Sequence, residues 1–207
     1  SQSMSEPFGD IERLERSGRE YDSLQRLAIV KQELIDTIGS LPDTTVFNIM
    51  AFASDVEPWK KKPTRANVLN KNNAAGWVED LEPKGGQSGA FRQRMGLNAP
   101  NANDGMTNTH KALMAAFGED VDAKKKRGRA TTFVTDPKDP IDTIFFLTDG
   151  EPTVGTTVDM GEIIEEVRRV NAFRGVQLHV IYVGAFGGKQ FKQLAEENDG
   201  VFVNIGS

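Results

Sequence analysis

Apolar residues form two kinds of pattern along the chain, one periodic and one continuous. Apolar residues that recur every three or four positions predict amphipathic helices at about 23–39, 72–81, 108–117, 159–173 and 189–198. Continuous runs of β-branched and aromatic residues predict buried strands at 45–53, 143–147, 178–183 and 201–205. Because strands of this kind are typical of parallel sheets under helices, the pattern predicts an α/β fold. We expect a doubly wound, mostly parallel sheet with helices on both faces.

Local signals mark the ends of several of these elements. Asp159 and Glu162 have the spacing of a capping box, and Gly118 occupies the position just after the helix at 108–117. The polar stretch at 56–69, around Trp59, is interpreted as a short edge strand with loops. From the helix at 108–117 onward, the predicted helices and strands alternate, as expected of a doubly wound sheet.

The chain is interpreted as one domain, 1–207, that carries two insertions. A length of 207 residues suits one α/β domain. The stretches at 87–104 and 120–140 lack periodicity and are expected to be surface insertions that determine partner specificity. The second contains the basic run Lys124 to Arg129, which is either a solvated loop or a contact for an acidic partner or membrane surface.

Composition and charge exclude several classes of protein. Hydrophobic residues make up 38% and charged residues 27%, the balance of a globular chain. The net charge of -5 argues against general nucleic-acid binding, which needs a positive surface. No stretch approaches the roughly 18 apolar residues of a membrane span. Because the chain has no cysteine, disulfides, thiolate nucleophiles and sulfur-ligated zinc or iron–sulfur clusters are excluded.

Oxygen-bearing side chains are expected to meet at one edge of the sheet. Thr107 lies in a hydroxyl-rich loop before a helix, and Asp149 directly follows the strand at 143–147. Ligands of doubly wound sheets bind outside the carboxyl ends of the strands, so both side chains are expected there. With Ser1 and Ser3 they offer the oxygen ligands that a hard divalent cation prefers.

Simpler interpretations of these residues stay open. Thr107 and Asn108 are also typical helix caps, and Asp149 before Gly150 is also a common turn residue. His110 is expected to be a surface residue or a neighbour of the ligands rather than a ligand. His179, inside a predicted strand, is expected to be packed.

The order of these motifs resembles the von Willebrand factor type A domain across essentially the whole chain. The segments that carry the resemblance are TVFNIMAFASDVEPW, GMTNTHKAL, TIFFLTDGEPTVG, LHVIYVG and DGVFVNI. That family builds a metal-ion-dependent adhesion site from Asp-x-Ser-x-Ser, a later threonine and a distal aspartate. The resemblance implies that Ser1 and Ser3 correspond to the serines, Thr107 to the threonine and Asp149 to the aspartate.

The resemblance also implies what such a site does. It is expected to hold Mg²⁺, or Mn²⁺ or Ca²⁺, and to bind an Asp or Glu side chain of a protein partner. The first Asp of the motif would lie two positions before Ser1, after a first strand expected upstream or on another chain. Without that Asp, metal binding is expected to weaken. Glu151 and Asp104 are candidates for the rim of the site.

Two other functions remain as alternatives. One is a metal-free structural or scaffolding domain within a larger protein. The other is a Mg-dependent phosphohydrolase. The sequence has no phosphate-binding Gly-x-x-x-x-Gly-Lys-Ser/Thr loop, no Gly-x-Gly-x-x-Gly after a strand and no Gly-x-Ser-x-Gly motif. We therefore expect a binding module and not an enzyme.

Overall fold

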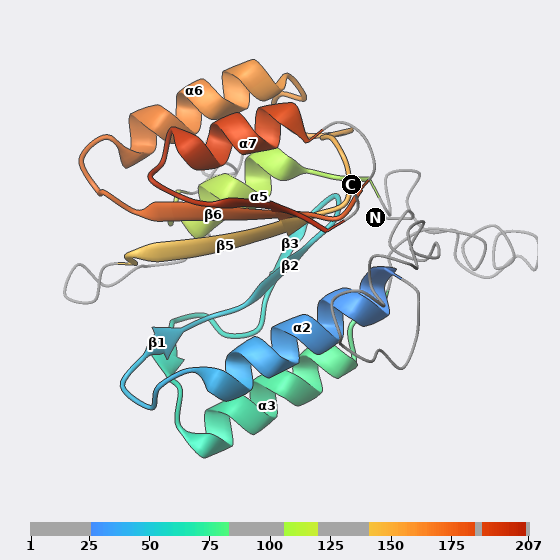
Figure 1. Ribbon diagram of the computed structural model, residues 1–207, viewed down its shortest axis with the longest axis vertical. Helices are drawn as coiled ribbons and strands as arrows, with labels where there is room; N and C mark the ends of the chain where they lie inside the picture. The colour runs from blue at the N-terminus through green and yellow to red at the C-terminus, as the bar shows by residue number, and fades with distance from the viewer. Residues whose placement is uncertain (1–25, 83–105, 120–140, 185–187, 206–207) are drawn as a thin grey trace, which may run out of the picture. The chain divides into compact units, whose positions relative to one another are not determined.

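The computed structural model describes residues 26–82, 106–119, 141–184 and 188–205; from residue 109 onward, helices and strands alternate (Figure 1). The chain divides into two compact units. One comprises Ser1–Ala51 with Pro58–Gly105, and the other comprises Phe52–Glu57 with Met106–Ser207. The expectation of a single domain with insertions at 87–104 and 120–140 stays a prediction, because both insertions lie outside the described residues.

The first unit pairs two helices, α2 (Arg26–Ser40) and α3 (Val68–Glu79). Ile38, Ala74 and Val78 form its buried core. The α3 helix begins four residues before the predicted start at 72, because Asn67 caps it. The Asn67 side chain accepts a hydrogen bond from the backbone N–H of Asn70 at 2.9 Å.

The single strand predicted at 45–53 is wrong. The segment forms two strands, β1 (Val46–Phe47) and β2 (Met50–Phe52), with Asn48 and Ile49 between them. The Asn48 side chain accepts from the backbone N–H groups of Ile49 at 3.0 Å and Lys60 at 3.3 Å, and donates to the Lys60 carbonyl at 2.8 Å. This side chain takes hydrogen bonds that a continuous strand would make through its backbone, so the strand is interrupted.

The stretch at 56–69 accordingly contains two short strands and the start of α3, where one edge strand was expected. β3 (Val56–Pro58) pairs with β2, and β4 (Thr64–Arg65) pairs with β1 in antiparallel register. The Trp59 ring stacks on Phe47 with 5.4 Å between centroids, which places this part of the stretch against the core of the first unit.

The second unit contains a parallel sheet in the order β5-β6-β7. Its strands are β5 (Thr143–Thr148), β6 (Gln177–Tyr182) and β7 (Phe202–Asn204). The register pairs Thr143 with Gln177 and Val180 with Phe202. Helix α6 (Met160–Asn171) connects β5 to β6, and helix α7 (Lys189–Glu196) connects β6 to β7. The parallel pairing predicted from the continuous apolar strands is therefore confirmed.

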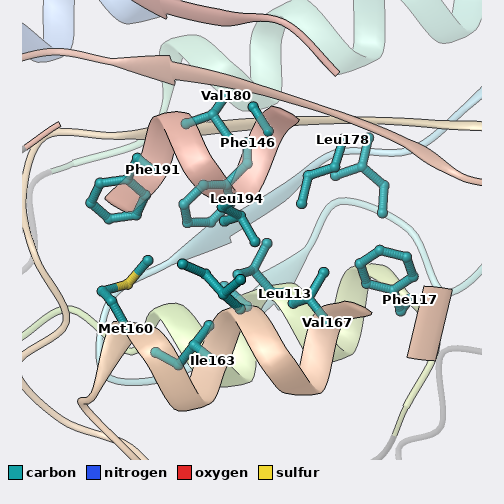
Figure 2. Packing of buried hydrophobic residues seen from close by; sticks show 14 of the residues in the cluster. Leu113, Phe117, Phe146, Met160, Ile163, Val167, Leu178, Val180, Phe191 and Leu194 are labelled. Carbon is teal, nitrogen blue, oxygen red and sulfur yellow. The ribbon is translucent and has the colours of Figure 1, made fainter. Parts of the chain in front are cut away.

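Helices α5 (Thr109–Ala116), α6 and α7 share one core with this sheet (Figure 2). Every second side chain of β5 and β6 is buried, as a period of two requires. The buried residues of this core include Leu113, Phe117, Phe146, Met160, Ile163, Val167, Leu178, Val180, Phe191 and Leu194. This packing joins β5 and α5 through one core, and both lead into the candidate site.

The predicted helix ends are largely correct. Gly118 has a φ of 77°, a left-handed conformation that suits glycine after the end of α5. Asp159 caps α6 by accepting from the Glu162 N–H at 3.0 Å. The Glu162 carboxylate accepts from the Thr157 hydroxyl at 2.6 Å, and the Asp159 N–H donates to that hydroxyl at 3.1 Å. The Thr157 hydroxyl thus forms hydrogen bonds with both residues of the expected capping box, Asp159 and Glu162.

Candidate functional site

Two of the predicted ligand residues lie on two loops of the second unit. Thr107 precedes α5 by two residues, and Asp149 follows the last residue of β5. Both are buried polar residues, each with 7% of its surface exposed. Because burying a polar side chain is costly unless it has a hydrogen-bond partner or a ligand, we expect both side chains to have one.

Hydrogen bonds join the Thr107 loop to the loop that follows Asp149. The Thr107 N–H donates to the Thr153 hydroxyl at 2.8 Å, and the Thr153 N–H donates to the Thr107 carbonyl at 2.9 Å. The Val154 N–H also donates to the Thr107 carbonyl at 3.3 Å. The structure thus brings Thr107 beside the segment that carries Asp149, although the two are far apart in sequence.

Asn108 connects these loops to the turn after β2. Its backbone N–H donates to the Ala53 carbonyl at 2.8 Å, and its side-chain amide donates to the Ser54 carbonyl at 3.2 Å. Its side-chain oxygen caps α5 by accepting from the Lys111 N–H at 3.0 Å. Gly155 has a φ of 142°, and a Cβ there would lie 2.5 Å from that oxygen. Glycine at 155 therefore allows the close approach of the two loops.

The backbone on either side of Asp149 is fixed by the end of β5. The Thr148 hydroxyl donates to the Gly150 carbonyl at 3.0 Å, across Asp149. The Thr148 carbonyl accepts from the Val183 N–H at 2.9 Å, which ties this end of β5 to the end of β6. Asp149 therefore lies at the carboxyl end of the parallel sheet, as its position after an apolar strand predicts.

The two histidines occupy structural positions. His110 is 2% exposed, so it is not at the surface, and its Nε2 lies 2.7 Å from the Glu166 carboxylate on α6. His179 stacks on Phe145 with 5.0 Å between ring centroids, and its Nδ1 accepts from the Val201 N–H at 3.0 Å. The packed position expected for His179 is confirmed.

The available donors are chemically suited to a hard cation. Thr107 and Asp149 offer a hydroxyl and a carboxylate oxygen, the ligand types that Mg²⁺ and Ca²⁺ prefer. Among the residues that the structure describes, no three His, Cys, Asp or Glu side chains are grouped as a metal site. At these loops the described residues among the predicted ligands thus offer one hydroxyl, from Thr107, and one carboxylate, from Asp149.

The remaining candidates divide into described and undescribed residues. Glu151 is exposed on the loop after Asp149. Ser1, Ser3, Asp104 and the basic run at 124–129 lie outside the described ranges, and their expected roles stay predictions.

Thr153 is a site residue that the sequence did not indicate. It lies four positions after Asp149 in a segment without periodicity, and nothing in its spacing distinguishes it from Thr156 or Thr157. The only available signal was the abundance of hydroxyl side chains in this loop.

The von Willebrand factor type A domain family matches residues 20–98 and 94–203 of the chain. The chain belongs to this family. Von Willebrand factor type A domains generally mediate protein–protein interactions and are generally not enzymes. A comparison with curated protein sequences gave no significant match.

Solved structures share the fold at low sequence identity. A von Willebrand factor type A protein from Catenulispora acidiphila is 14% identical, with a TM-score of 0.54; the match covers 86% of this chain and 34% of that one. The conserved hypothetical protein BatB from Bacteroides thetaiotaomicron is 15% identical, with a TM-score of 0.57, over 99% of this chain and 85% of that one. An aerotolerance-related membrane protein from Bacteroides fragilis gives the same identity and TM-score, over 99% and 86%.

These likenesses confirm the Rossmann-like, doubly wound α/β fold of the von Willebrand type A chain. The chain spans about a third of the Catenulispora protein, so they bear on the domain alone. None of the helices in the described ranges is long and apolar enough to cross a membrane.

Proposed function

We propose that this von Willebrand type A chain is a divalent-cation-dependent protein-binding module. In this proposal Ser1, Ser3, Thr107 and Asp149 hold Mg²⁺, or Mn²⁺ or Ca²⁺, and an Asp or Glu side chain of a protein partner completes the coordination. The main support is the hydrogen-bonded junction between the Thr107 loop and the loop after Asp149, with both side chains buried.

The charge of the ligand set favours an acidic partner. Three of the four proposed ligands are neutral hydroxyls, and only Asp149 is anionic. A divalent cation with one anionic protein ligand keeps a net positive charge and attracts a further carboxylate. Magnesium also keeps several waters when the protein supplies few ligands, and a partner carboxylate can replace one of them.

A metal-free structural domain is the second candidate, and one observation favours it. The bonds from Thr107 to Thr153 and from Asn108 to Ala53 join the loops directly, between groups of the protein itself. The loops can therefore keep their arrangement in a protein that binds no metal. We propose no catalytic role, because the sequence lacks the phosphate-binding and nucleophile motifs of hydrolases.

Thermal unfolding with and without divalent ions tests the proposal. An ion at 100 times its dissociation constant stabilises the folded state by about 2.7 kcal/mol, so we expect Mg²⁺ or Mn²⁺ to raise the Tm above its value in EDTA. Asp149→Ala and Thr107→Ala should remove this increase. Asp142→Ala is the matched control, because Asp142 is exposed just before the other end of β5.

The alternatives give different results. A Tm that Mg²⁺, Mn²⁺ and Ca²⁺ all leave unchanged in the wild type contradicts the metal proposal and supports the structural domain. An increase that persists in Asp149→Ala places the ion elsewhere and removes Asp149 from the ligand set.

A further inference from the structure

We propose that Thr153 is the residue that positions Thr107 relative to Asp149. Its effect on metal affinity rests on the function proposed above, whereas its effect on the Thr107 loop does not. The inference comes from the hydrogen bonds of Thr107, which join its backbone to one segment of the loop after β5.

The two threonines form a closed pair of hydrogen bonds. Thr107 donates its N–H to the Thr153 hydroxyl at 2.8 Å and accepts the Thr153 N–H at its carbonyl at 2.9 Å. Two bonds between the same residues fix both the separation and the relative orientation of the two loops. Because a side chain leaves from its own backbone, fixing the backbone of Thr107 also limits where its hydroxyl can point.

The Thr153 hydroxyl is the specific part of this pair. Any residue at 153 except proline can supply the backbone N–H, but only a side chain with an acceptor can receive the Thr107 N–H. Thr153 is itself exposed, whereas Thr107 is buried. The hydroxyl therefore contributes little to the core, and its hydrogen bond reaches a residue at the candidate site.

The contacts of the next residue, Asn108, make the position of Thr107 sensitive to its hydrogen bond with the Thr153 hydroxyl. Asn108 is held by Ala53 and Ser54 at the turn after β2, and it caps α5. Thr107 is thus held from two sides. Its neighbour Asn108 is bonded to the turn after β2, and its own backbone is bonded to Thr153 in the loop after Asp149. Groups that orient metal ligands in this way change metal affinity by about 10- to 100-fold when removed.

Three variants separate this role from a general effect on the loop. Thr153→Val keeps the shape of the side chain and removes the acceptor. Thr153→Ser keeps the acceptor and should restore the wild-type behaviour. Thr157→Val is the control, because it removes another hydroxyl from the same loop, one that donates to Glu162 at 2.6 Å.

Two measurements test the inference. Isothermal titration calorimetry with Mg²⁺ should give about a 10-fold weaker Kd for Thr153→Val, and values within about twofold of wild type for Thr153→Ser and Thr157→Val. Amide hydrogen exchange of the metal-free protein should show faster exchange at Thr107 in Thr153→Val alone.

Each outcome decides one of the two proposals. If the wild type binds no Mg²⁺, the proposed function fails, and hydrogen exchange at Thr107 still tests the positioning role. Unchanged exchange at Thr107 in Thr153→Val overturns the inference. So does an unchanged Kd in that variant when the wild type binds Mg²⁺, or an equal weakening in Thr157→Val. If Thr153→Val does not fold, the same exchange measurement on Thr153→Ala supplies the decision.

Discussion

The side-chain amide of Asn171 donates a hydrogen bond of 2.8 Å to the side-chain oxygen of Asn198. Both residues are buried, with 9% and 3% of their surfaces exposed. Asn171 also exchanges two 2.8 Å hydrogen bonds with the backbone of Val176. One side chain thus connects the end of α6, the residue before β6 and the end of α7.

Replacing Asn171 should therefore destabilise the second unit. Asn171→Leu has a similar volume but leaves the Val176 N–H, the Val176 carbonyl and the Asn198 side-chain oxygen without this partner, so we expect a loss of about 3 kcal/mol in the free energy of unfolding. Urea unfolding followed by circular dichroism measures it. Gln193→Leu, an amide-to-leucine change on the exposed face of α7, should stay within about 0.5 kcal/mol of wild type. Equal effects of the two changes would contradict the role of the buried network.

The residue at 200 must be glycine for β7 to reach β6. A Cβ on Gly200 would lie 1.9 Å from the Leu178 carbonyl oxygen and 2.4 Å from its carbon. Because these are backbone atoms of β6, Gly200→Ala should separate the strands and cost about 3 kcal/mol or more. Thermal unfolding measures the loss.

Gly76, in the interior of α3, is the control for Gly200, because a Cβ at Gly76 would meet nothing within 4 Å. Gly76→Ala should stabilise the protein by about 0.5 to 1 kcal/mol through its better helix propensity. A Gly200→Ala protein as stable as wild type would show that the two strands can move apart without penalty.

Asn108 and Asn67 are two helix caps that differ in their other contacts. Both side chains accept from the N–H three residues later, but Asn108 is 7% exposed and also donates to Ser54, whereas Asn67 is exposed. We expect Asn67→Ala to cost about 1 kcal/mol and Asn108→Ala about 2 kcal/mol, measured by chemical unfolding. Equal losses would mean that the link to Ser54 contributes no stability.

Glu166 is the partner of the buried His110 imidazole, and its neighbour Glu165 forms an exposed pair with Arg168. Glu166→Ala removes the acceptor 2.7 Å from Nε2 and should destabilise the protein by about 1 to 3 kcal/mol, because that nitrogen stays buried. Glu165→Ala should change stability by no more than about 0.5 kcal/mol. Denaturant titration of both variants measures the difference, and a Glu166→Ala protein as stable as Glu165→Ala would contradict the contribution of the pair.

The helices and the parallel strands of the second unit could be predicted from sequence because burial determines both. The strands β5 and β6 are rich in β-branched and aromatic residues, and α6 presents Ile163 and Val167 to the core. The start of α3 could not be predicted in this way, because Val68 and Leu69 are each 68% exposed. The start of α3 depends on the Asn67 cap, and the spacing of apolar residues does not indicate where a capping residue lies.

The candidate site was predictable only in part. The positions of Thr107 before a helix and of Asp149 after a strand follow from the order of motifs. The contacts of Asn108 and Thr153 do not, because hydrogen bonds between loops depend on backbone conformation and leave no periodic pattern. The break at Asn48 was missed for the same reason, since one side chain replaces three contacts of a regular strand.

The parallel order β5-β6-β7 also has a kinetic consequence. Thr143 and its partner Gln177 are separated in sequence by the whole of α6, so no local hairpin can start this sheet. Pairing must wait for distant segments to meet, which makes folding slow compared with that of a helical bundle of equal stability. The newly formed chain therefore leaves unpaired strand edges open to other molecules for longer, and refolding yield should fall as protein concentration rises.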